Sequence, residues 1–281
     1  MVENRPWRTF FTHLVLIMGV SVIVFPLVVA LLAASHENTE LIGGIPLWFG
    51  GELLANFKTA LSRGLQASGG QAVAPMMLNS LYMALGIACG KIMISLTAAY
   101  AVVYFRFPLR GLFFWMIFMT LMLPVEVRIL PTFQVVADLG MLNSQAGLIV
   151  PLIASATATF LFRQFFLTIP DELMEAARID GAGALKFFWD VVLPLSRTNI
   201  AALFVILFIY GWNQYLWPLL ITTEEEMYTV VMGIQRMVYV ADTVAQWNII
   251  MATALLAMLP PMLVVIAMQR LFVKGLIETE K

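Results

Sequence analysis

The sequence is poor in the residues that usually carry catalysis and metal binding. Its 281 residues include one cysteine, Cys89, and two histidines, His13 and His36. A single cysteine excludes an intrachain disulfide and a cysteine-based metal site. The two histidines lie at opposite ends of one long apolar run, so they do not form a cluster. We therefore predict neither a metal nor a cofactor.

Charged residues are also scarce. Asp, Glu, Lys and Arg make up 12% of the chain and hydrophobic residues 61%, with a mean hydropathy of +0.90. Soluble domains carry roughly 25% charged residues, so this composition excludes an ordinary soluble protein. We expect an all-α integral membrane protein that is surrounded by the lipid bilayer, and no nucleic acid as a partner.

A nucleotide-binding loop is missing as well. Gly90 and Lys91 superficially match the end of a phosphate-binding P-loop. However, Leu85 stands where the first glycine of that loop belongs, and Ile92 stands where Ser or Thr belongs. We therefore expect a subunit without a catalytic site, which draws any energy from ATP through another chain.

Six apolar runs have about the 20 residues that are needed to span a bilayer. They cover residues 12–34, 75–104, 112–130, 147–166, 199–221 and 248–272. An even number of spans places both termini on one side of the membrane. The first run is preceded by Arg5 and Arg8, as in a secretory signal, but it is longer than a usual signal core and no clear cleavage site follows. We expect it to be a retained helix.

The distribution of Lys and Arg predicts the orientation, because cytoplasmic flanks carry more of them. One side carries Arg5, Arg8, Arg106, Arg110, Arg163, Arg178, Lys186, Arg197, Arg270, Lys274 and Lys281. The other side carries Lys58, Arg63, Arg128 and Arg236. This bias places both termini and the loop between the fourth and fifth runs in the cytoplasm.

That loop, residues 168–196, interrupts the apolar pattern with a dense set of charges. Thr168 fits an N-cap and Pro170 a first helical turn, while Gly181 can end the helix with a positive φ. Four residues between them share one helical face. They are Leu173, Ala176, Ala177 and Asp180.

A second short helix is expected over residues 184–190, and Pro194 is expected to stop it. Its bulky apolar side chains are those of Leu185, Phe187, Phe188 and Trp189. Two interpretations of the loop are open. Its helices either pack on their own bundle or form a docking element for a soluble partner.

The loop resembles the EAA loop of ABC importer membrane subunits. The residues that match, in the order and spacing of that family, are Glu175, Ala176, Ala177, Asp180, Gly181, Ala182, Leu193 and Pro194. The one departure is Val191, where the family usually has isoleucine. The resemblance covers roughly residues 74–275, strongly at this loop and weakly elsewhere.

The resemblance implies a type I ABC importer permease fold of the carbohydrate-uptake group, in the bacterial inner membrane, with six transmembrane helices and both termini cytoplasmic. It divides the chain into an N-terminal helix with the first periplasmic loop (residues 1–73), a permease domain (74–275) with the coupling stretch 168–196, and a cytoplasmic tail (276–281). The implied partners are a second homologous permease subunit, two copies of a cytoplasmic ABC ATPase and a periplasmic solute-binding protein. The implied solute is sn-glycerol-3-phosphate or a related glycerophosphodiester, with a neutral sugar as the alternative.

Five polar residues are candidates for lining the translocation path: Lys91, Glu126, Arg128, Asn213 and Gln214. Lys91 is the single cation deep within a predicted span, which is costly. It either pairs with a carbonyl or carboxylate or attracts an anionic solute. Glu126 and Arg128 lie between two prolines in a segment expected to be irregular, and they either snorkel to the interface or line the outer mouth of a pore. Asn213 and Gln214 hydrogen-bond either across helices or to a solute.

Two other classes of function fit six spans. A secondary transporter is expected to show inverted repeats or several intramembrane acids, and neither is visible in the sequence. A membrane receptor or anchor could also present the 168–196 loop to a soluble partner.

Overall fold

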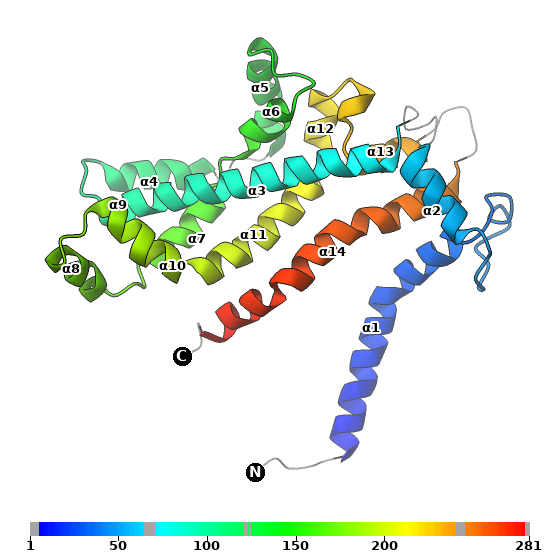
Figure 1. The fold of residues 1–281 in the computed structure, drawn as a ribbon, viewed down its shortest axis with the longest axis horizontal. Helices are drawn as coiled ribbons and strands as arrows, with labels where there is room; N and C mark the ends of the chain where they lie inside the picture. The colour runs from blue at the N-terminus through cyan, green and yellow to red at the C-terminus, as the bar shows by residue number, and fades with distance from the viewer. Residues whose placement is uncertain (1–5, 65–70, 121–122, 124, 240–244, 279–281) are drawn as a thin grey trace. The chain divides into compact units, whose positions relative to one another are not determined.

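The computed structural model describes all residues except 1–5, 65–70, 121–122, 124, 240–244 and 279–281. Every regular element in these residues is helical (Figure 1). The long helices are α1 (Pro6–Ala34), α3 (Val73–Tyr104), α11 (Arg197–Trp212) and α14 (Trp247–Glu278). The shorter helices are α2 (Leu53–Ser62), α4 (Arg110–Met119), α5 (Val125–Asp138), α6 (Gln145–Ile149), η3 (Val150–Leu152), α7 (Ala156–Phe166), α8 (Asp171–Ile179), α9 (Ala184–Phe187), η4 (Phe188–Val192), α10 (Leu193–Leu195), α12 (Leu216–Ile221), η5 (Glu225–Met227) and α13 (Val230–Val238).

Three helices of the described chain are long and apolar enough to cross a membrane. They cover Trp7–Ala34, Val73–Tyr104 and Trp247–Gln269. Two further pairs of helices pass the same test together but are bent, by 47° between η3 and α7 and by 71° between α10 and α11, so the number rises to five if each pair is one span. The six predicted spans therefore stay a prediction.

Three of the predicted spans are interrupted. The run over residues 112–130 is divided between α4 and α5, the run over 147–166 is divided among α6, η3 and α7, and the run over 199–221 is divided between α11 and α12. The segment from Glu126 to Pro131 was expected to be irregular, but it is helical, because α5 continues through Pro131. Hydropathy averages over such breaks, which is why the sequence predicted continuous spans.

The chain forms two compact units, and the first comprises Met1–Pro75 and Gly233–Leu259. Asn56 of α2 caps the end of α1. The Asn56 side-chain amide donates to the carbonyl oxygens of Ala34 (2.9 Å) and His36 (3.0 Å), groups that have no partner within the helix. The Asn248 amide in turn donates to Asn56 Oδ1 (3.1 Å) and ties α14 to the same point.

The second unit comprises Met76–Met232 and Pro260–Lys281. Its core is a cluster contributed by α3, α5, α6 and α12: Met83, Ile87, Val136, Leu148, Trp217 and Ile221. The Trp217 indole N–H donates to the carbonyl oxygen of Gly147 (3.2 Å). At the carboxyl end of α3 lie α8 and α9 (Figure 1).

Small residues on α3 allow its neighbours to pack closely. A Cβ atom added at Gly86 would lie 2.7 Å from Ile149 Cδ1, and one added at Gly211 would lie 2.9 Å from the Cα of Ala84. Small residues at such positions let helix backbones approach closely. The contact between Gly211 and Ala84 brings α11 against the backbone of α3.

Gly211→Val should therefore destabilise the second unit, because its side chain would collide with the α3 backbone at an overpacking cost of about 1–3 kcal/mol. We expect a lower thermal midpoint of the detergent-solubilised protein, measured by loss of the monodisperse peak. Gly19→Val is the matched control, since a Cβ atom there meets nothing within 4 Å. Equal midpoints for the two variants would contradict the prediction.

Candidate functional site

The predicted cap of the helix in the 168–196 loop is wrong. The Thr168 hydroxyl donates to the carbonyl oxygen of Phe165 (2.7 Å), so it closes the end of α7 and is not available to cap α8. Pro170 occupies the N-cap position, and α8 begins at Asp171. Asp171 and Glu172 then lie in the first turn, where carboxylates stabilise the helix dipole.

The predicted end of this helix is confirmed. Gly181 has a φ of 73°, a conformation that costs other residues about 1–2 kcal/mol. Its N–H donates to the carbonyl oxygen of Arg178 (3.0 Å), and the N–H of Ala182 donates to that of Ala177 (2.8 Å). These bonds satisfy the last carbonyl groups of α8 and turn the chain toward α9.

The prediction that Pro194 stops the second helix is also wrong. The chain passes from α9 through the π-helical turn η4 into α10, and Pro194 lies in the first turn of α10. The wider π turn changes the hydrogen-bond register ahead of Pro194. A proline costs least in the first turn of a helical segment, because an N–H there would have no partner within the helix. The helical run ends at Ser196, where the 71° bend to α11 lies.

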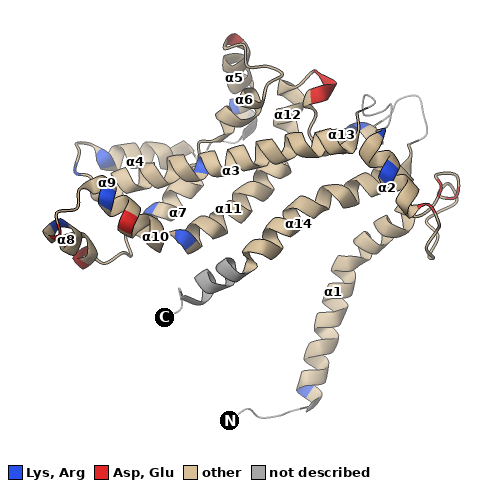
Figure 2. Cartoon of the chain, viewed as in Figure 1, with Lys and Arg blue, Asp and Glu red and all other residues tan. Residues whose placement is uncertain are grey.

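The loop presents an exposed face that is partly apolar. Glu175 and Ala176 are exposed, whereas Ala177 is half-buried and lines a pocket toward α3. The expected shared alanine face is therefore divided. The most exposed apolar side chains are those of Ile179 (86% exposed), Leu185 (75%) and Trp189 (62%). Figure 2 shows Lys, Arg, Asp and Glu concentrated on the helices around them.

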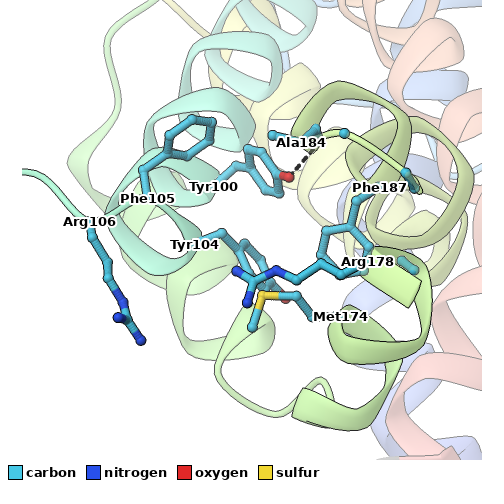
Figure 3. Close-up of a pocket in the computed structure, with 11 residues that line it drawn as sticks. Tyr100, Tyr104, Phe105, Arg106, Met174, Arg178, Ala184 and Phe187 are labelled. Atoms are coloured by element: carbon cyan, nitrogen blue, oxygen red, sulfur yellow. Dashed lines mark hydrogen bonds between the residues drawn. The ribbon is translucent and has the colours of Figure 1, made fainter. Parts of the chain in front are cut away.

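A pocket of about 330 Å³ lies between the loop and the carboxyl end of α3 (Figure 3). The Tyr100 hydroxyl donates to the carbonyl oxygen of Ala184 (2.7 Å), at the first residue of α9. The ring of Tyr104 packs edge-on against that of Phe187, with centroids 5.3 Å apart. Arg178 of α8 lines the same pocket. Two aromatic residues of α3 therefore hold α9, and the sequence did not single them out.

A second site brings together three of the five residues that were predicted for the translocation path. Lys91, Arg128 and Gln214 line one cavity of about 110 Å³. Lys91 is the one charged residue of α3 and is 7% exposed. Its Nζ atom lies 3.9 Å from the centroid of the Tyr210 ring, within the range of a cation–π interaction.

Asn213, which was also predicted for the path, is not among the described residues that line this cavity. Asn213 is exposed, and its backbone N–H donates to the carbonyl oxygen of Ile209 (3.0 Å) at the end of α11. The side chain of Glu126 lies outside the described residues. Thr132 also lines the cavity and was missed, although it stands one helical turn after Arg128 on α5.

Comparison with known proteins identifies the family. The family described as "Binding-protein-dependent transport system inner membrane component" matches residues 91–278. The chain belongs to this family. It is 56% identical over 282 residues to the proteins named sn-glycerol-3-phosphate transport system permease protein UgpE of Brucella melitensis and Rhizobium meliloti, with 100% of each chain covered. The Escherichia coli O1:K1 protein of that name is 56% identical over 285 residues, again with full coverage.

A solved structure shows the same fold. It is a bacterial ABC transporter involved in the import of the acidic polysaccharide alginate, with a TM-score of 0.78 and 18% identity over 96% of this chain and 99% of that chain. The fold is thus that of a type I ABC importer permease. Membership of a binding-protein-dependent transport family sets aside the alternatives of a secondary transporter and of a receptor or anchor.

The contact between Tyr100 and Ala184 predicts the local stability of the loop. Tyr100→Phe removes one hydrogen bond of about 0.5–1.5 kcal/mol, so amide exchange in residues 184–195 should accelerate by about twofold to tenfold. Hydrogen–deuterium exchange with mass spectrometry measures this. Tyr82→Phe, at a 60% exposed position on the same helix, should leave exchange unchanged, and identical rates in both variants would refute the anchoring role of Tyr100.

Proposed function

We propose that the chain is the membrane-spanning permease subunit of an ATP-driven importer that moves sn-glycerol-3-phosphate or a related glycerophosphodiester across the bacterial inner membrane. The observation that carries the proposal is full-length identity of 56% to permeases named for sn-glycerol-3-phosphate. The permease domain is residues 74–275, with six spans and both termini in the cytoplasm. The excess of Lys and Arg on the loop side supports this orientation.

The 168–196 loop is the coupling element in this proposal. It docks into a groove of a cytoplasmic ABC ATPase, of which the importer holds two copies, one for this chain and one for a second homologous permease. Glu175 offers a carboxylate to a partner cation, Ala176 allows a close approach, and Gly181 sets the bend. The exposed apolar groups of α8 and α9 support docking, because a patch of this kind is typical of an interaction surface.

Transport follows from the way in which ATP shifts the conformational equilibrium. When the two ATPase copies close on ATP, their grooves move and carry the two coupling loops. The spans then change from inward-facing to outward-facing, and the loaded periplasmic binding protein releases solute into the path. ATP drives the change because it binds the two states with different affinity.

The solute is tested by uptake into vesicles that hold the complete complex of both permeases, the ATPase and the binding protein. Labelled sn-glycerol-3-phosphate should enter only with ATP inside and binding protein outside, and a hundredfold excess of maltose should not compete. Competition by maltose, or uptake of maltose in place of the phosphate ester, would favour the neutral-sugar alternative and overturn the assignment of the solute.

Two substitutions test the coupling element. Glu175→Lys reverses the charge of the docking face. Gly181→Pro forces φ to about −65° and removes the N–H that closes α8. Both variants should abolish uptake while inserting into the membrane at normal levels, as judged by immunoblot of washed membranes. Glu225→Lys, at an exposed position outside the loop, is the control for charge reversal. Normal uptake by both loop variants would contradict the docking hypothesis.

A further inference from the structure

The cavity at Lys91 lies where two helical runs are broken. Pro151, Leu152 and Ala154 line it from the break between η3 and α7, and Gln214 and Leu216 line it from the break between α11 and α12. Within a bilayer, irregular backbone is tolerated only against protein or a water-filled cavity. In transporters, broken helices of this kind form binding sites for solutes.

The charges in the cavity are of one sign. Lys91 reaches it from α3, and Arg128 reaches it from α5. None of the described residues that line the cavity is acidic. Two cations near each other in a medium of low dielectric constant are costly, and an anion between them would remove that cost.

The two cations differ in their setting. Lys91 is nearly buried and held over the Tyr210 ring, whereas Arg128 is exposed. Gln214 Nε2 donates to the carbonyl oxygen of Tyr210 (3.1 Å), which leaves its Oε1 atom as an acceptor for a hydroxyl group. The cavity of about 110 Å³ has room for several waters, since one water needs about 10–15 Å³. A small phosphate ester with a hydroxyl-bearing tail matches these groups.

We propose that this cavity is a phosphate-binding station on the translocation path, in which Lys91 and Arg128 together hold the phosphoryl group of the solute and Gln214 accepts from a hydroxyl of its glycerol part. The inference rests on the proposed function and specifies how the solute is recognised. A phosphomonoester carries a charge of about −1.5 to −2 at pH 7, which matches two cations. A phosphodiester carries one charge and needs only one of them, so the pair favours the monoester.

The test uses the complete importer in vesicles and compares uptake of sn-glycerol-3-phosphate with that of the diester glycerophosphoglycerol. Arg128→Gln should lower uptake of the monoester by about tenfold or more, because a charge-assisted bond is lost. Uptake of the diester should fall by about fivefold or less, because Lys91 still pairs with its single charge. Arg128→Lys should restore most of the monoester uptake.

Arg110→Gln is the matched control, since Arg110 is exposed on α4 and does not line the cavity. Its uptake should stay within about twofold of the unaltered importer. Co-purification of the ATPase and its basal hydrolysis rate show that each variant assembles. Lys91→Met should also lose monoester uptake. If this variant fails to assemble, the Arg128→Gln variant still tests the proposal, because Arg128 is exposed.

The outcomes separate the two proposals. If the unaltered importer takes up no sn-glycerol-3-phosphate, the proposed function fails, and this inference fails with it. If the unaltered importer is active and Arg128→Gln retains normal uptake, or loses monoester and diester uptake equally, only the phosphate-binding station is overturned.

Discussion

The close contact between Gly211 and the backbone of α3 at Ala84 is the constraint on which the second unit depends. It fixes how α11 lies on α3, and therefore where the neighbouring Tyr210 lies. Two helical turns beyond Ala84, the Tyr210 ring meets the Lys91 ammonium at 3.9 Å. A larger residue at position 211 would push α11 away and separate ring and ammonium. The packing of small residues thus sets the geometry of the one charged residue of α3.

The same helix connects the cavity to the coupling loop. Lys91 and Tyr100 are nine residues apart on α3, roughly 14 Å along the axis at 1.5 Å per residue. Tyr100 holds α9 through Ala184. In the proposed mechanism, α3 is therefore the element that would transmit a movement of the loop to the cavity.

The sequence predicted single residues better than it predicted the helix pattern around them. Gly181 was expected to take a positive φ, and it does, because the end of a helix requires this conformation of a single residue. Lys91 stood out because a lone cation in an apolar run is costly in any fold. Thr168 and Pro194 were misjudged because their roles depend on neighbouring elements: the hydroxyl of Thr168 serves the preceding helix, and a π turn accommodates Pro194. Such roles are decided by tertiary packing, which local sequence propensities do not describe.

The Tyr210 ring stabilises the Lys91 ammonium in a way that leaves its charge available to an anionic solute. A permanent carboxylate partner would neutralise the ammonium and compete with an incoming anion. The face of an aromatic ring stabilises a cation by about 2 kcal/mol when desolvated, and it leaves the charge uncancelled. Passage also requires that the solute leave, so a site on the path must bind weakly enough to release it. In the proposed binding station, an ammonium over Tyr210 and a second cation on the exposed Arg128 would attract an anionic solute without holding it permanently.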